Sequence, residues 1–260
     1  MLATDKITYQ ISDIDLLKNI SVEMVAGQLS VILGPNGAGK STLIKNLSGE
    51  LKSTKGEVYL DSKNLKDWNN SLLASRRSVV TQFNSVNFPF NVSEIVMMGL
   101  LNTPGDSESA DLLTRVEDMM KEMDIHHLQQ RLYSTLSGGE QQRVSIARAL
   151  VQVMKAANEG QACYLLLDEP TASLDLKHQH ELMRLLKQKS MQKFCVVAIL
   201  HDINLAIQYA DLVILMKNGE VIATGCPNEI ISSDNMKDVF SINGKLETLT
   251  DGSQRFYVME

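Results

Sequence analysis

The sequence predicts an α/β fold with a mostly parallel sheet and flanking helices, together with an antiparallel β part near the N-terminus and an inserted α-helical subdomain. Three observations support this prediction. Short apolar segments alternate with helical segments over residues 29–47 and 164–216, as in crossover-connected parallel sheets. A glycine-rich loop separates one apolar segment from a helix. Between residues 83 and 149, apolar residues instead recur at helical spacing.

The N-terminal part of the chain is expected to consist mainly of strands. Residues 29–33 form a short apolar segment that leads directly into the glycine-rich loop. A helix is expected over residues 40–47, because Leu43, Ile44 and Leu47 recur on one helical face. The other strands are expected at residues 6–9, 20–24, 56–60 and 78–82.

The pattern changes to helical after Gln82. Ser93 is expected to be the N-cap of a helix, with Glu94 in its first turn. Residues 102–109 are polar and contain Pro104-Gly105, so a loop is expected there. The insertion is expected to end near a helix that begins at Gly138.

Strands and helices alternate again in the C-terminal half. Asn218-Gly219 predicts a hairpin turn of the primed type, and Asp251-Gly252 predicts another hairpin close to the C-terminus. The expected strands are residues 164–167, 195–200 and 212–216, and the expected helices are residues 176–190 and 203–209. Because no long-period repeat is present, a single nucleotide-binding domain is expected over residues 1–260. Its core is expected at 1–82 and 150–240, with a helical subdomain at about 83–149 and a C-terminal hairpin at 241–260.

Composition limits the classes of function. The chain has 260 residues, 44% of them hydrophobic, and a net charge of −6. This composition argues against extensive disorder and against a nucleic-acid partner. The longest apolar segments are far shorter than a membrane span, so a partner is expected to supply any membrane part. Cys163 and Cys195 lie in apolar segments and are expected to be small buried hydrophobic residues.

The glycine-rich loop predicts a phosphate-binding site. Its glycines allow backbone conformations that let N–H groups point at phosphate oxygens, and the following helix adds its positive N-terminal end. Lys40 is expected to reach the β- and γ-phosphates, Ser41 to bind Mg²⁺, and Thr42 to contact the α-phosphate. The loop comprises Gly34, Pro35, Asn36, Gly37, Ala38, Gly39, Lys40, Ser41 and Thr42.

Two adjacent carboxylates follow the apolar segment at residues 164–167. Asp168 lies at the end of an expected strand, where a carboxylate can hold Mg²⁺. Glu169 would then lie near the γ-phosphate and polarise the attacking water. A nucleoside triphosphate and Mg²⁺ are therefore expected at a P-loop NTPase core, and the resemblance given next implies that the nucleotide is ATP.

The segment Leu136-Ser137-Gly138-Gly139-Glu140-Gln141, placed between these two motifs, resembles the signature of the ATP-binding subunits of ABC transporters. The resemblance covers nearly the whole chain. It implies that Ser137, Gly138, Gly139 and Gln141 act on ATP bound to the opposite subunit of a homodimer. It further implies roles for four residues elsewhere: Gln82 near Mg²⁺ and the attacking water, Asp175 in a loop crossing the dimer interface, His201 as a switch residue at the γ-phosphate, and Tyr9 stacked on adenine. For Tyr9, ordinary packing of an N-terminal strand is the alternative.

The family resemblance also implies partners and a location. These are two transmembrane permease subunits, an indirectly acting periplasmic substrate-binding protein, and a peripheral position on the cytoplasmic face of the bacterial inner membrane. A permease helix would dock in a cleft near residues 84–94, where Phe88-Pro89-Phe90-Asn91-Val92 offers apolar anchors. Packing of the helical insertion onto the core is the alternative role for these aromatic residues.

The finer resemblance is to bacterial importers of haem and of iron or cobalamin chelates. Residues 88–99 and 174–179 carry it, and a long link at 151–162 resembles the haem-import ATPases in particular. Leu100 departs from the Arg common in that group. Haem import is therefore expected, with iron-siderophore or cobalamin import as the alternative. A non-transport ABC ATPase, such as an iron–sulfur assembly factor, and a plain P-loop kinase or GTPase are the other classes weighed.

Overall fold

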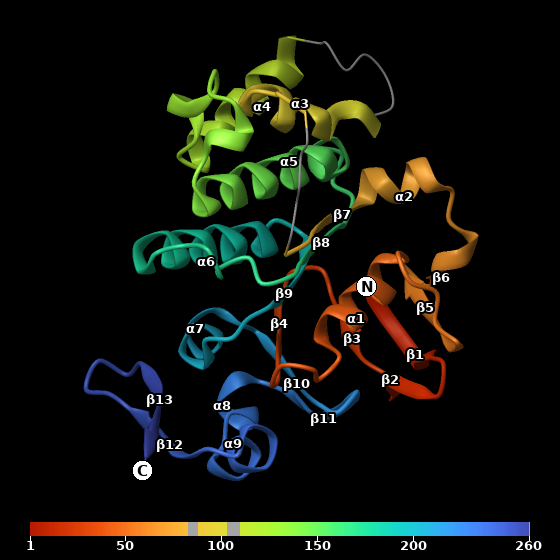
Figure 1. Cartoon of the computed structure of the whole chain (residues 1–260), viewed down its shortest axis with the longest axis vertical. Coiled ribbons are helices and arrows are strands. Elements are labelled where there is room, and N and C mark those ends of the chain that lie inside the picture. Colours follow the sequence, from red (N-terminus) through yellow and green to blue (C-terminus); the bar gives the residue numbers. More distant parts are fainter. Residues whose placement is uncertain (83–87, 103–109, 260) are drawn as a thin grey trace.

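The structure is a computed structural model that describes residues 1–82, 88–102 and 110–259. Its centre is a six-stranded sheet in the order β11-β10-β4-β9-β8-β7 (Figure 1). All neighbouring strands are parallel except β11, which pairs antiparallel with β10. The strands are β4 (Leu29–Leu33), β7 (Arg77–Val80), β8 (Cys163–Leu167), β9 (Phe194–Ile199), β10 (Leu212–Lys217) and β11 (Glu220–Gly225). The predicted mostly parallel sheet is confirmed.

Helices lie on both faces of this sheet. Between β7 and β8 the described chain is helical, as expected, and α5 continues without a break through residue 150 and through most of the link at 151–162. The loop expected at 102–109 lies almost entirely outside the described residues. The α-helices are α1 (Lys40–Ser48), α2 (Asn70–Arg76), α3 (Val92–Met97), α4 (Ala110–Glu122), α5 (Gly138–Asn158), α6 (Leu176–Met191), α7 (Ile203–Tyr209), α8 (Pro227–Ile230) and α9 (Ser233–Phe240). Short 3₁₀ helices are η1 (Leu65–Asp67), η2 (Met98–Asn102), η3 (His126–Leu128) and η4 (Tyr133–Thr135).

The start of α3 corrects one expectation. Its N-cap is Asn91 rather than Ser93, because the Asn91 side chain accepts a hydrogen bond from the Glu94 N–H at 3.0 Å. The Glu94 carboxylate accepts the Asn91 N–H in return, at 2.8 Å. This reciprocal pair is a capping box. Ser93 lies inside the first turn and donates its hydroxyl to the Asn91 side chain.

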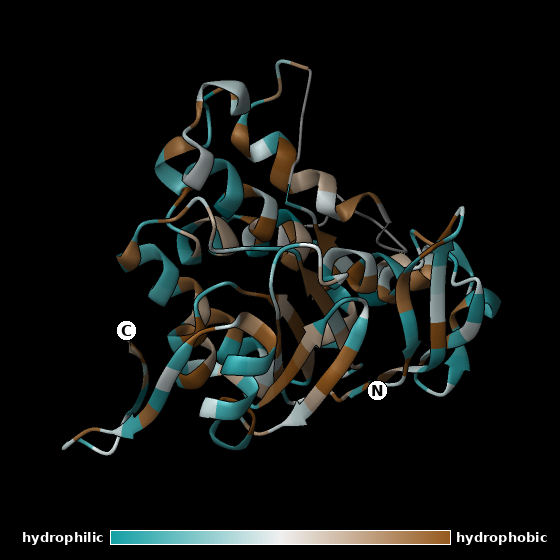
Figure 2. Ribbon diagram, turned by 60° about the horizontal axis from the view of Figure 1, so that its bottom comes forward, coloured by the Kyte–Doolittle hydropathy of each residue, from teal (hydrophilic) through white to brown (hydrophobic). Residues whose placement is uncertain are grey.

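The apolar core lies on both faces of the central sheet. Along β4 all five residues are buried; Val31 and Leu33 pack into one core cluster and Ile32 into the other. The first cluster includes side chains of α5, α6 and α7, and the second includes side chains of α1 and the N-terminal strands. Burial on both faces explains why these strands are apolar throughout rather than alternating, as the brown strands at the centre of Figure 2 show.

An antiparallel sheet formed by N-terminal residues covers the α1 side. Its order is β2-β1-β5-β6, and β3 also pairs with β1. The strand expected at 20–24 is interrupted, because the Thr4 hydroxyl donates to the Ile20 carbonyl and accepts the Val22 N–H, both at 3.0 Å. The strands are β1 (Leu2–Ile11), β2 (Ile14–Ile20), β3 (Glu23–Met24), β5 (Lys55–Leu60) and β6 (Lys63–Asn64).

Both predicted hairpins are present, with different turns. Asn218 and Gly219 join β10 to β11 with φ values of 50° and 81°, as a primed two-residue turn requires. The C-terminal strands β12 (Asn243–Thr248) and β13 (Gln254–Met259) are instead joined by the longer loop 249–253.

Within the described ranges, none of the helices is both long enough and apolar enough to cross a membrane.

The sheet topology brings distant sequence segments together. The glycine-rich loop follows β4, Asp168 follows β8, and His201 follows β9 by two residues. These three strands are parallel neighbours. Their carboxyl ends therefore meet at one edge of the sheet, which is where α/β proteins place their ligands.

Candidate active site

The glycine-rich loop turns sharply into α1. Gly39 precedes the helix with φ 95°, and a Cβ atom at this position would lie 2.7 Å from the carbonyl oxygen of Leu16 in β2. No side chain caps the N-terminus of α1. Its first N–H groups are therefore available to an anion, with the helix dipole favouring negative charge.

Lys40 is held against the loop itself. Its Nζ donates to the carbonyl oxygens of Gly34 at 2.8 Å and Pro35 at 2.9 Å. Burial lowers the pKa of Lys40, and the nearby charges of Glu169 and Asp168 oppose that shift. The ammonium thus lies in the loop, close to both carboxylates of the site.

Ser41 and Asp168 face one another. The Ser41 hydroxyl donates to Oδ1 of Asp168 at 3.1 Å. Asp168 is only 5% exposed, and burial raises the pKa of its carboxyl group. A carboxylate and a hydroxyl in this position are the hard oxygen ligands that Mg²⁺ prefers. A divalent cation would also offset the burial of the Asp168 charge, so these residues fit the predicted metal.

Glu169 connects three segments of the site. Its Oε1 lies 2.6 Å from Nε2 of His201, and its Oε2 accepts a hydrogen bond from Nε2 of Gln82 at 2.7 Å. The Glu169 backbone has φ 52°, a left-handed conformation that is costly for a residue with a Cβ atom. The turn after β8 therefore accepts backbone strain and places this carboxylate between the ends of β7 and β9.

These groups surround a groove of about 460 Å³. Asp168 does not line the groove but is hydrogen-bonded to Ser41, which does, and Gly34 and Pro35 contribute the carbonyls that hold Lys40. The lining residues are Leu16, Asn36, Gly37, Ala38, Gly39, Lys40, Ser41, Thr42, Gln82, Glu169 and His201. The predicted loop residues and the predicted catalytic residues are thus brought to one place.

Tyr9 is not among the residues that line this groove. It is partly buried and packs against the core cluster on the α1 side. Tyr9 lies opposite Leu17 in the β1–β2 pair, and the neighbouring Leu16 lines the groove instead. Leu16 was not among the residues predicted for the site. No signal distinguished it, because the pairing of β1 with β2 is what brings it there.

The signature segment lies at the start of α5. Ser137 is the N-cap, and its hydroxyl forms a capping box with Glu140. A Cβ atom on Gly139 would lie 2.8 Å from the carbonyl oxygen of Ser173. Only glycine therefore allows the signature turn to pack this closely on the segment that leads to Asp175.

Gln141 and Asp175 support the backbone in this region. The side-chain amide of Gln141 donates to the carbonyls of Tyr133 and Leu136, both at 3.2 Å. Asp175 caps α6 and accepts the His178 N–H at 2.9 Å. This hydrogen bond is the main cause of the lowered pKa of Asp175. The five residues Ser137, Gly138, Gly139, Gln141 and Asp175 are not part of the lining of this chain's own groove.

The fold and the groove are those of a P-loop ATPase, and comparison with known proteins gives its family. Residues 17–172 match the ABC transporter family. The chain belongs to the ABC transporter ATP-binding proteins, which confirms the resemblance based on the signature segment. Proteins of this family bind ATP and couple its hydrolysis to transport, and they work as dimers together with membrane permease components.

Individual relatives match over most of the chain. The Hemin import ATP-binding protein HmuV of Pseudoalteromonas translucida is 39% identical over 96% of this chain and 96% of its own length. The protein of the same name from Hahella chejuensis is 42% identical over 89% of both chains.

Solved structures match as well. The bacterial ABC transporter cassette MJ0796, in its dimeric structure, has a TM-score of 0.76 and 30% identity, covering 87% of this chain and 99% of that one. The cbiO1 protein from Clostridium perfringens, part of the ABC transporter complex cbiONQ, has a TM-score of 0.73 and 32% identity, covering 91% and 92%.

Proposed function

We propose that this chain is the ATP-hydrolysing subunit of a bacterial haem importer, acting as a homodimer on the cytoplasmic face of the inner membrane. The observation that carries the ATPase part is the arrangement of Glu169 between His201 and Gln82 above the Lys40 loop. The haem part rests on two relatives named for hemin import, which cover at least 89% of this chain. Iron-siderophore or cobalamin import is the alternative cargo assignment.

Hydrolysis would follow from the positions of the groups in the groove. The loop N–H groups and Lys40 hold the phosphates and stabilise charge on the γ-phosphate. Glu169 accepts a hydrogen bond from the attacking water and orients it, while His201 and Gln82 fix the two carboxylate oxygens. Ser41 and Asp168 would hold Mg²⁺, which supplies neutralisation of phosphate charge.

A second subunit would complete each site. Ser137, Gly138 and Gly139 lie at the N-terminus of α5, which suits an anion. We assign them to the γ-phosphate of ATP on the opposite subunit, with Asp175 at the dimer interface. For Gln141 we propose a positioning role, since its amide already holds two carbonyls of the signature turn.

The proposed permease surface comprises the exposed Phe88, before α3, and a second pocket. Phe88 is 68% exposed, so its ring is available to a partner, whereas Phe90, 6.1 Å away between ring centroids, is partly buried and packs against the core. The preceding part of the docking segment, at 84–87, lies outside the described residues. We retain the division into a core, a helical subdomain from about residue 83 to 149, and a C-terminal hairpin as part of this proposal.

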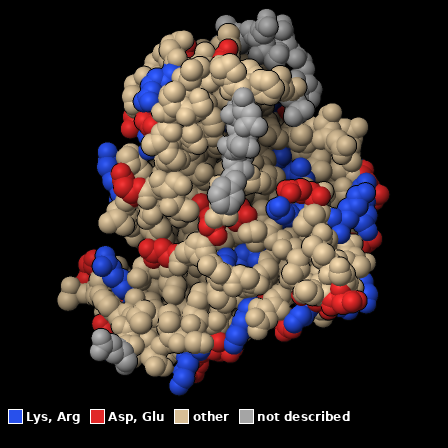
Figure 3. Space-filling model, in the orientation of Figure 1, with Lys and Arg blue, Asp and Glu red and all other residues tan. Residues whose placement is uncertain are grey.

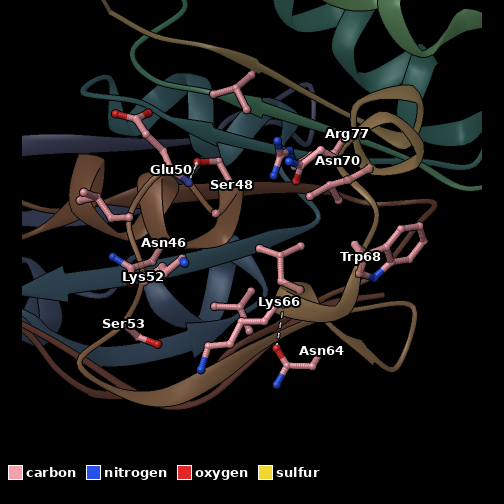
Figure 4. A pocket seen from close by; sticks show the side chains of 16 residues that line it. Asn46, Ser48, Glu50, Lys52, Ser53, Asn64, Lys66, Trp68, Asn70 and Arg77 are labelled. Carbon is pink, nitrogen blue, oxygen red and sulfur yellow. Dashed lines mark hydrogen bonds between the residues drawn. The ribbon is translucent and has the colours of Figure 1, made fainter. Parts of the chain in front are cut away.

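The second pocket, of about 460 Å³, lies between the end of α1, α2 and β7 (Figure 4). Within the described structure, Trp68 Nε1 and Arg77 Nε are buried there without a hydrogen-bond partner. Burial lowers the pKa of Arg77 to about 10. We assign this pocket to an acidic side chain of a permease, which would pair with the Arg77 guanidinium charge. On the face shown in Figure 3, acidic and basic side chains are interspersed, and a broad area over the helical part is mostly uncharged.

The test is a pull-down from native membranes with the tagged full-length chain. Recovery of a polytopic permease supports the transport motor, and haem binding by the associated periplasmic substrate-binding protein supports the cargo. Recovery of soluble partners alone would favour an assembly factor instead. Binding of a siderophore or cobalamin, and not haem, would overturn the haem assignment only.

A further inference from the structure

At the start of α5, the Glu140 carboxylate occupies the hydrogen-bond donors of Ser137. Oε2 of Glu140 accepts the backbone N–H of Ser137 at 2.7 Å and the Ser137 hydroxyl at 2.9 Å. The Ser137 hydroxyl oxygen also accepts the Glu140 N–H, at 3.3 Å. Both donors that Ser137 could offer to a phosphate are therefore engaged by a negative group of the same chain.

Positive groups surround this carboxylate. Nη1 of Arg131 lies 3.9 Å from Oε1 of Glu140, and Arg131 is itself held by a hydrogen bond from Nη2 to the Thr135 carbonyl at 2.9 Å. Arg143 lies one helical turn beyond, and its Nε is buried without a hydrogen-bond partner among the residues described. Hydrogen bonds from Ser137 and these arginine charges lower the pKa of Glu140, with the Ser137 backbone as the largest cause. Glu140 is thus held in its charged form at the start of α5.

We propose that Glu140 sets the ATP requirement of the dimer, because its carboxylate competes with the γ-phosphate of the partner subunit's ATP for the Ser137 donors. This inference rests on the proposed function, in which Ser137 contacts that phosphate. Two negative groups a few ångströms apart at one helix N-terminus repel each other strongly. The carboxylate must therefore turn away as the dimer closes, and Arg131, already 3.9 Å from its Oε1, offers it a destination. Glu140 is a positioning residue in this account, acting through Ser137.

Glu140→Gln tests the idea, since an amide oxygen can still accept the Ser137 N–H but carries no charge. The assay measures dimer formation by size-exclusion chromatography with light scattering across MgATP concentrations. Every chain in this assay also carries Glu169→Gln, so that the bound ATP is not hydrolysed. We expect the ATP concentration at half-maximal dimerisation to be about five- to tenfold lower with Glu140→Gln than in the parent. The difference between the variants should shrink as NaCl is raised from about 0.05 to 0.5 M, because salt screens the repulsion.

The control is Asp234→Asn, which removes a charge from the first turn of α9, a helix capped by Ser232. Its midpoint should match that of the Glu169→Gln parent. If Glu140→Gln acted only by weakening the cap of α5, the ATP concentration needed for dimerisation would rise rather than fall. A midpoint for Glu140→Gln that is unchanged or higher, in chains that do dimerise, overturns the inference. No ATP-dependent dimer in the Glu169→Gln parent would instead overturn the proposed sandwich dimer.

Discussion

The imidazole Nε2 of His201 lies 2.6 Å from the Glu169 carboxylate, across the ends of two neighbouring strands. Gln82, at the end of a third strand, holds the other oxygen of the same carboxylate at 2.7 Å. Glu169 is thus fixed from both sides, on a backbone with φ 52°. A carboxylate fixed in this way loses little freedom when it orients a water molecule, which is what a general base needs.

Glu169→Gln should therefore keep ATP binding but stop turnover. Lys40 and Asp168 remain in place to hold MgATP, while the amide cannot accept the proton. We expect the hydrolysis rate to fall about 10²–10⁴-fold, with ATP-stabilised dimers visible by size-exclusion chromatography. Hydrolysis at the wild-type rate would show that Glu169 is not the base.

Ser137→Arg should abolish hydrolysis but leave the ATP affinity of the monomer within about twofold of wild type. A residue that acts across an interface affects only the assembled dimer. Ser137 is exposed in the monomer, so an arginine side chain there has room in its own subunit but would crowd the phosphate of the opposite one. Fluorescent ATP binding at dilute protein concentration measures the affinity of the monomer, and phosphate release measures hydrolysis. If monomer binding disappears together with hydrolysis, Ser137 acts within its own subunit.

Asp168→Asn separates stability from activity. Burial raises the pKa of Asp168. The free energy of unfolding therefore falls as pH rises from the ordinary pKa of an aspartate to the raised pKa of Asp168, because the unfolded chain releases this proton first. The asparagine carries no charge, and we expect a higher unfolding midpoint than wild type at pH 7 without nucleotide. The midpoints should converge as pH falls through the raised pKa of the folded Asp168 and below the ordinary pKa of an aspartate carboxyl group. We expect MgATP hydrolysis to fall at least 10²-fold, as for other groups that stabilise transition-state charge. A lower midpoint at pH 7 would contradict the assignment.

Gly39→Ala should weaken ATP binding and destabilise the fold. The new Cβ atom would lie 2.7 Å from the Leu16 carbonyl at a residue with φ 95°, and strain of this kind costs about 1–3 kcal/mol. Gly160→Ala is the matched control, since Gly160 has φ 73° with nothing within 4 Å of its Cβ position. The control should lose some stability by denaturant unfolding yet bind ATP normally. Equal ATP affinity in the two variants would argue against a role for the turn at Gly39.

Much of the fold follows from sequence patterns that depend on local physics. The apolar segment at 195–200 predicted β9, and the apolar recurrence at Leu43, Ile44 and Leu47 predicted α1. Asn218-Gly219 predicted its turn because few other pairs adopt two positive φ values.

The misses come from side-chain competition and from tertiary pairing. Asn91 and Ser93 are both good N-caps, and the choice depended on which one places Glu94 at the third helical position. The break after Ile20 depended on Thr4, a residue distant in sequence. In the site, Leu16 could not be predicted because the β1–β2 register positions it. Gln141 could be recognised by the signature wording, but its two carbonyl partners depend on the fold of η4.

The central claim is that ATP hydrolysis by this chain drives haem import, and transport-coupled hydrolysis tests it most directly. The chain is purified with the permease that it retains from membranes and reconstituted in liposomes with the cognate periplasmic binding protein. The measurement is phosphate release and haem uptake with and without haem-loaded binding protein. We predict that haem-loaded protein stimulates both, and that Glu169→Gln abolishes both. Hydrolysis without haem uptake, or uptake that persists with Glu169→Gln, would contradict the account.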